Sequence, residues 1–110
     1  MVIATRLLKI RTATAEYPVQ VRIHAPDKKD TAWSCNYEID WPEGVEQRAA
    51  WGVDSAQALL VAFQMIGADL YTSSYHKAGE LVFETVGAGY GFPVPSSLRP
   101  FLVGDDARFQ

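Results

Sequence analysis

The sequence has few of the residues that usually mark a redox, metal or nucleophilic site. Its 110 residues include one cysteine, Cys35, and two histidines, His24 and His76. A single cysteine excludes an internal disulfide, and two histidines without matched spacing or a cysteine cluster do not make a metal-binding pattern. We therefore expect neither a metal ion nor any other cofactor.

The chain also lacks a surplus of basic residues and a long apolar run. Ten lysines and arginines stand against 13 acids, which gives a net charge of −3 and a pI near 5.2. Such a balance provides no basic field for a phosphate backbone, so nucleic acid is not an expected partner. The opening MVIATRLLKI has no apolar core of a signal peptide. We predict a cytoplasmic protein without a membrane segment.

The composition is that of a globular protein, with 48% hydrophobic and 21% charged residues. There is no repeat or linker, so residues 1–110 are expected to form one domain. The charges are unevenly placed, because residues 26–54 hold seven acids and three bases, a balance of −4. An acidic central segment of this kind suits a basic partner.

The most strongly patterned stretch runs from Asp54 to Tyr71. Asp54 is an N-cap residue, and Gln57 stands three positions later, where it can reach back as in a capping box. The stretch is apolar except for a few positions such as Gln64 and Asp69, which argue against a membrane span. We predict a core helix that is covered on most of its circumference.

Four strands are predicted before this helix, over residues 2–12, 17–25, 31–41 and 45–53. The first has no clean alternation, which indicates a bulge or two partly buried faces. In the others the odd positions from Tyr17 to Val53 are mostly apolar and are expected to face the helix. Pro42-Glu43-Gly44 resembles a three-residue hairpin loop, which would set Trp41 opposite Val45 and Cys35 opposite Trp51.

After the helix, Leu81 and Phe83 alternate with glutamates and predict a fifth strand. Ser97 can cap a short turn from Leu98 to Val103, and the tail from Asp105 to Gln110 is expected to be loose. The predicted fold class is α+β: an antiparallel β-meander of about five strands with one long helix packed across its inner face.

Candidate catalytic residues are few. Cys35 falls on the inward face opposite a tryptophan, which favours an inert buried thiol over a nucleophile. Asp69, Ser73 and His76 share one side of a helix if the helix extends that far, and they could supply an acid, a hydroxyl and a base. No turn for an oxyanion adjoins them, and they equally fit a solvated helix end. No catalytic residue is predicted.

The segment from Gly87 to Pro95 contains three glycines and two prolines and cannot be a regular element. Its G-x-G-x-G spacing does not match a phosphate loop, because Pro93 stands where a helix would have to begin. We predict that Tyr90 and Phe92, carried by the backbone of Gly89, Gly91 and Pro93, form a binding surface for a partner. The alternative is that the two aromatics close one end of the core as a lid.

Three motifs carry a family resemblance. They are GVDSAQAL at 52–59, QMIG at 64–67 and GFPVP at 91–95. With these motifs the chain resembles a family of small bacterial domains of unknown function. The resemblance implies no catalytic or binding residue.

Three functions remain open. The first is a non-catalytic cytoplasmic module that binds a protein partner or associates with itself. The second is a small enzyme that uses Asp69, Ser73 and His76. The third is a homodimeric protein that binds a small ligand between the helix and the glycine-rich loop.

Overall fold

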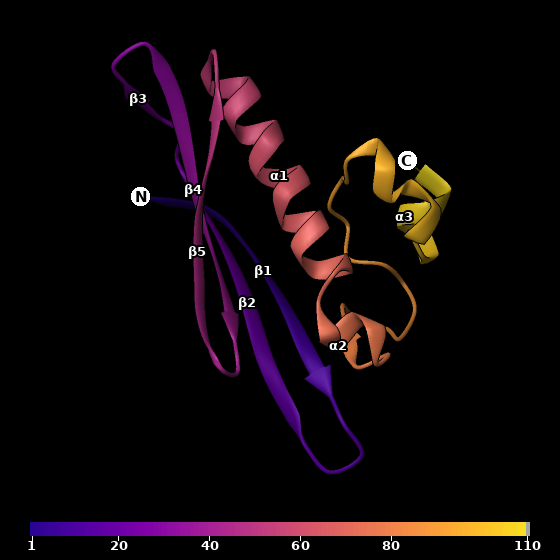
Figure 1. Ribbon diagram of the computed structural model, residues 1–110. Helices are drawn as coiled ribbons and strands as arrows, with labels where there is room; N and C mark the ends of the chain where they lie inside the picture. Colours follow the sequence, from indigo (N-terminus) through magenta and orange to yellow (C-terminus); the bar gives the residue numbers. More distant parts are fainter. Residues whose placement is uncertain (110) are drawn as a thin grey trace.

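The structure, a computed structural model, describes residues 1–109, and it has the predicted α+β architecture of an antiparallel sheet with one long helix (Figure 1). The elements are β1 (Val2–Arg11), β2 (Glu16–His24), β3 (Asp27–Lys29), β4 (Ala32–Trp41), β5 (Gly44–Gly52), α1 (Ser55–Tyr71), α2 (Ser74–Lys77), β6 (Leu81–Val82), the 3-10 helix η1 (Ser96–Phe101) and α3 (Gly104–Phe109).

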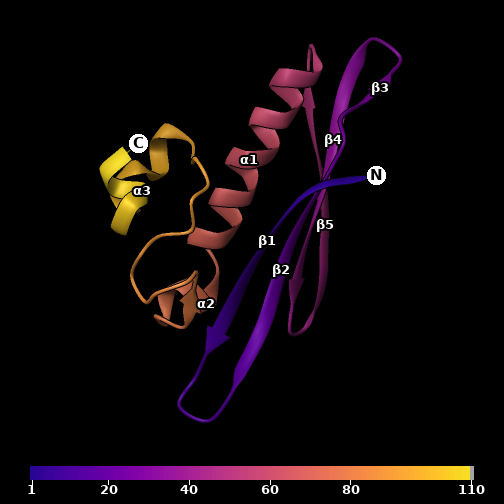
Figure 2. The ribbon, with the colours of Figure 1, turned by 180° about the vertical axis from the view of Figure 1, so that it is seen from behind.

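Strand β4 is the centre of the sheet. One of its edges pairs with β5 along its whole length, so β2 and β3 both pair with the other edge. Strand β1 pairs with β2 and, near its end, with the short β6. Helix α1 packs on β4 and β5. The C-terminal segment lies on the opposite side of α1 from the sheet, as the two opposite views show (Figures 1 and 2).

The start of α1 is the predicted cap. The Gln57 backbone N–H donates to Asp54 Oδ1 at 2.8 Å, and Gln57 Oε1 accepts from the Val53 N–H at 2.7 Å. The fully buried side of the helix, with Ala62 and Ile66, faces the core. Most of the circumference is covered as predicted, because residues 61–71 are buried or half-buried, and the exception among the large apolar side chains is Leu60, which is 51% exposed. The sheet and residues 91–95 pack against sides of the helix other than the one that carries Leu60.

The alternation predicted for β2 and β4 is confirmed over most of both strands, but Tyr17, predicted to face the core, is 47% exposed, and Ser34, predicted to face solvent, is 4% exposed. The buried residues in these strands include the odd positions Val19, Val21, Ile23, Cys35, Tyr37 and Ile39. The irregularity expected in the first strand is also present, as a register shift between Val2 and Ala4. Strands β2 and β4 are neighbours in the sheet, and they therefore provide the apolar surface on which the helix and the glycine-rich loop pack.

The predicted register of β5 is wrong by one residue. The hairpin loop has two residues, Pro42 and Glu43, because Trp41 pairs with Gly44 and Cys35 pairs with Ala50. Since side chains alternate along a strand, this shift moves every odd residue of β5 to the outer face of the sheet. Trp51 is consequently 54% exposed, although we predicted it in the core.

The C-terminal predictions also need correction. Residues 105–109, expected to be loose, belong to α3 from Gly104 to Phe109, while Gln110 lies outside the described residues. The expected turn at 98–103 is a 3-10 helix, Ser96–Phe101, with Pro95 rather than Ser97 at its cap. The fifth strand is only Leu81–Val82, because Glu84 has a positive φ of 61° that ends the extended backbone.

The position of Cys35 gives a direct test of the β4 orientation. Its side chain is fully buried, its Sγ lies 3.3 Å from the His24 carbonyl oxygen, and burial raises the pKa of the thiol. We expect no reaction with an aromatic disulfide reagent in native buffer and immediate reaction in denaturant, followed by absorbance. Asn36→Cys, on the neighbouring outward position, should react in the folded state. Rapid labelling of native Cys35 would contradict the orientation of β4.

Candidate functional site

The structure places Tyr90 and Phe92 in the core, where they are 4% and 5% exposed. Phe92 packs against Phe63 on α1 at a centroid distance of 6.2 Å, and Tyr90 packs against Tyr71 at 4.9 Å. The two aromatics therefore close one end of the core, which is the lid that we gave as the alternative. A partner contact through the same loop stays a prediction.

The backbone of this lid needs two of its glycines. Gly89 and Gly91 have φ values of +88° and +80°, which side chains disfavour. A Cβ atom on Gly91 would lie 2.2 Å from the guanidinium of Arg6. Pro93 meets the helix at Gly67, where an added Cβ would lie 2.1 Å from the Pro93 carbonyl oxygen. Close backbone approach therefore accounts for QMIG and GFPVP together.

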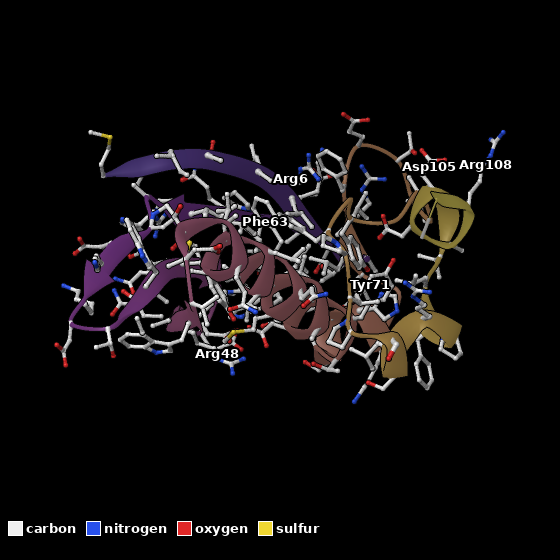
Figure 3. All side chains as sticks on the ribbon, turned by 90° about the horizontal axis from the view of Figure 1, so that it is seen from above. Arg6, Arg48, Phe63, Tyr71, Asp105 and Arg108 are labelled. Carbon is white, nitrogen blue, oxygen red and sulfur yellow. The ribbon has the colours of Figure 1, made fainter. Side chains whose placement is uncertain are left out.

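A buried carboxylate holds the lid in place. Asp106 of α3 is 3% exposed and accepts hydrogen bonds from the Tyr71 hydroxyl at 2.6 Å and from the backbone N–H groups of Tyr90 and Gly91, each at 2.8 Å. Figure 3 shows Tyr71 on the side of the helix that faces the C-terminal segment. Asp106 was not predicted as a site residue, because the segment from Asp105 to Gln110 was expected to be loose.

A cavity does lie between the helix and the glycine-rich loop, as the small-ligand hypothesis requires. Its volume is about 180 Å³, and its lining includes Ala4, Thr5, Arg6, Ile23, Phe63, Gly91, Phe92 and Pro93. Arg6 spans this region, because it donates to the Tyr90 carbonyl at 2.9 Å and its guanidinium lies over the rings of Phe83 and Phe92. Ligand pockets usually measure about 300–1,000 Å³, so this cavity gives the hypothesis little support.

The structure does not bring Asp69, Ser73 and His76 together. Ser73 caps α2, where its hydroxyl donates to the Leu70 carbonyl and accepts from the His76 N–H. The His76 ring instead contacts Tyr90 through a hydrogen bond between Nδ1 and the tyrosine hydroxyl, and burial lowers the pKa of His76. Ser73 therefore has no histidine base at its hydroxyl.

Asp69 instead faces the sheet and joins a polar group there. It accepts from the Tyr37 hydroxyl, and its Oδ1 lies 2.8 Å from Nη1 of Arg48. Burial, together with the nearby Glu46 carboxylate, raises the pKa of Asp69 to about 6. Figure 3 shows Arg48 and Arg6 on opposite sides of α1, so this group is separate from the lid.

We call the surface depression beside Asp69 the acidic hollow. Its volume is about 300 Å³, and it is lined by Trp41, Glu43, Glu46, Asp69, Thr72, Ser73, Ser74 and Tyr75. The rings of Trp41 and Tyr75 stack at a centroid distance of 5.4 Å. Each ring donates to a carboxylate, Trp41 Nε1 to Glu46 at 2.8 Å and the Tyr75 hydroxyl to Glu43 at 2.6 Å.

The acidic hollow was not predicted from the sequence. Glu46 was assigned to the outer face, and the two-residue loop places it on the inner face, opposite Ile39. Trp41 and Tyr75 are far apart in the sequence, so no local pattern links them. The acidic balance of residues 26–54 was the one available indication, because Glu43 and Glu46 belong to that segment.

The acidic hollow lacks the geometry of a metal site. Among residues 1–109, no three His, Cys, Asp or Glu side chains are grouped so that they could hold a metal ion. The chemistry of the hollow is therefore that of carboxylate acceptors beside aromatic rings. Such groups recognise organic cations, because carboxylates accept charged hydrogen bonds and aromatic faces attract positive charge.

Residues 4–94 match a family described as Domain of unknown function (DUF6968). No curated protein and no solved structure matches the chain. Within the part of the chain that the structure describes, no helix has the length and apolar character needed to cross a membrane.

Proposed function

The chain belongs to the family described as a domain of unknown function (DUF6968), and we propose that it is a non-catalytic cytoplasmic module that binds a protein partner. In this proposal the acidic hollow receives the side chain of an arginine or a lysine of the partner. The observation that carries the proposal is the combination of a stacked aromatic pair with three carboxylates in one hollow.

The charges around the hollow favour a cation. Glu43, Glu46 and Asp69 supply three negative charges, and Arg48 supplies one positive charge, so the local balance is −2 when all four are ionised. A guanidinium is the best match, because its planar donors pair with carboxylates while its face stacks on an aromatic ring.

The same groups give little basis for catalysis. Nucleophilic catalysis needs a hydroxyl or thiol beside a base, and Ser73 in the hollow already donates to the Leu70 carbonyl. The histidine that could have served as the base lies against Tyr90 instead. Binding is therefore the activity that these contacts support best.

We expect a short peptide with one central arginine to bind the acidic hollow. In NMR spectra of the ¹⁵N-labelled protein, the peptide should shift the indole resonance of Trp41 and the amide resonances of residues 43–46 and 72–75. The same peptide with citrulline is the matched neutral control. A charged hydrogen bond is worth about 1.5–3 kcal/mol, so the citrulline peptide should bind at least about tenfold more weakly.

Two substitutions and a change of pH test the same binding site. Glu46→Gln should weaken arginine binding by about tenfold, whereas Glu84→Gln, an exposed acid outside the hollow, should leave it unchanged. Because the pKa of Asp69 is about 6, its carboxylate becomes ionised as pH rises from 5 to 7, and affinity for arginine should increase over that interval. Equal shifts with both peptides, or shifts located elsewhere, would contradict the proposal.

A further inference from the structure

Strand β5 forms one edge of the sheet. Its nine residues pair with β4 in a continuous register from Trp41 and Gly44 to Trp33 and Gly52, and residues 1–109 provide no strand on its other side. Proteins usually protect such an edge with proline, lysine, a bulge or a short strand. The strand GVEQRAAWG has no proline, no lysine and no bulge, and the two charged side chains that it turns inward, Glu46 and Arg48, are of opposite sign.

The side chains that β5 presents on the outer face of the sheet are apolar except for Gln47. Val45 and Trp51 are each 54% exposed, and Ala49 between them is also exposed. A long edge strand with exposed apolar residues is a surface that pairs readily with another strand.

The free hydrogen-bonding groups of the edge can be assigned from the hairpin. In a two-residue hairpin the residues that flank the loop, here Trp41 and Gly44, exchange backbone hydrogen bonds. In an antiparallel pair every second residue then bonds to the neighbour. The intervening residues Val45, Gln47, Ala49 and Trp51 therefore direct their N–H and C=O groups toward the free edge.

We propose that a second copy of this chain pairs with β5 in antiparallel orientation, with Gln47 of each copy opposite the other. In this register Glu46 lies opposite Arg48 of the second copy on the inner face, and the symmetry produces this pair twice. On the outer face Val45 lies opposite Ala49 of the second copy. Cross-strand pairs of opposite charge stabilise a sheet, and like charges directly opposite destabilise it.

Charge complementarity favours a second copy of this chain as the partner of β5, and it favours this register. A register centred on Arg48 would place two arginines opposite each other, which the chosen register avoids. Arg48 keeps its bond to Asp69, and its side chain remains 46% exposed and able to contact a second carboxylate. The backbone groups of the odd residues carry the edge pairing, and none of these residues lines the acidic hollow, whereas Glu46 belongs to both proposals.

Analytical ultracentrifugation of the full chain across a range of concentrations tests the proposal. We expect a reversible dimer whose Kd rises by about tenfold or more in Ala49→Pro. This substitution removes a backbone N–H that points toward the free edge, and it leaves the hydrogen bonds to β4 in place. Ala56→Pro is the matched control, because its exposed position in the first turn of α1 tolerates proline. This control should dimerise as the parent chain does.

A charge exchange tests the register. Glu46→Lys alone and Arg48→Glu alone should each weaken the dimer, whereas an equimolar mixture should form heterodimers, because every cross-strand pair is then of opposite sign. Circular dichroism verifies that each variant is folded. If Arg48→Glu does not fold beside Asp69, Glu46→Lys and Ala49→Pro still decide the question.

A monomeric parent chain at all concentrations would overturn the proposal, as would an unchanged Kd in both Glu46→Lys and Ala49→Pro. Arginine-peptide binding distinguishes this failure from failure of the proposed function, because Ala49→Pro leaves the acidic hollow intact. If that variant is monomeric and still binds the peptide, both proposals hold.

Discussion

Replacing both lid aromatics, as Tyr90→Ala with Phe92→Ala, is expected to lower the free energy of unfolding by roughly 5 kcal/mol or more. Both rings are at least 95% buried, and truncation of one buried Phe to alanine typically costs about 3–5 kcal/mol. Because the two residues share one loop, their losses need not add in full. A domain of this size is stable by about 5–15 kcal/mol, so much of the chain should unfold under mild conditions.

The contacts explain the size of this effect. Tyr90 fills the space beside Tyr71 and His76 at centroid distances of 4.9 and 5.5 Å, and its hydroxyl is hydrogen-bonded to Nδ1 of His76. Phe92 packs against Phe63 and lies beside the guanidinium of Arg6. The substitutions therefore remove apolar contacts and also leave a partly buried histidine nitrogen without its partner.

Urea denaturation at 25 °C measures the change, and Phe101→Ala provides a control. Phe101 lies in the same C-terminal part of the chain but is 63% exposed, so its truncation should cost no more than about 0.5 kcal/mol. Unchanged stability of the double variant, with loss of partner capture, would contradict the lid and favour the contact surface that we first predicted.

The parts of the fold that were predictable are those with strong local patterns. The apolar run after Asp54 and the alternation in β2 and β4 can be recognised from neighbouring residues alone, because residues on the same face of a helix or strand recur every few positions. The cap at Asp54 is also local, since its partners Val53 and Gln57 lie within four positions.

Strand β5 shows where such a pattern fails. Its odd positions are the more apolar, with Val45, Ala49 and Trp51, so periodicity indicates that they are buried. The loop length overrides this preference, because a two-residue connection sets Trp41 opposite Gly44 and turns those residues outward. The inward positions Ala50 and Gly52 are small because α1 lies close to them; a Cβ on Gly52 would lie 2.4 Å from the backbone nitrogen of Ala58.

The candidate sites were less predictable because they join distant segments. The acidic hollow needs the β4–β5 loop, the end of α1 and α2 at the same place. Glu43 contacts Tyr75 across 32 positions of sequence, and Tyr37 contacts Asp69 across the same number. The composition indicated an acidic segment, but it is the tertiary fold that brings the carboxylate of Asp69 and the aromatic rings next to this segment.

Asp106→Ala is expected to lower the free energy of unfolding by roughly 3 kcal/mol, although the side chain is small and near the end of the chain. The carboxylate accepts from the Tyr71 hydroxyl and from the backbone N–H groups of Tyr90 and Gly91. Leaving a buried donor unsatisfied costs about 1–3 kcal/mol, and three donors lose their acceptor together. Water that enters the opened space would recover part of the loss.

Asp105→Ala is the matched control, because its side chain is exposed and its removal should change stability by no more than about 0.5 kcal/mol. Amide hydrogen exchange separates a local effect from a global one. In Asp106→Ala the Tyr90 and Gly91 amides should lose protection more than the amide of Val21 in the sheet, because the lid opens before the sheet does. Equal losses at all three amides would mean that Asp106 stabilises the whole fold instead of closing the lid over the Tyr71 side of the helix.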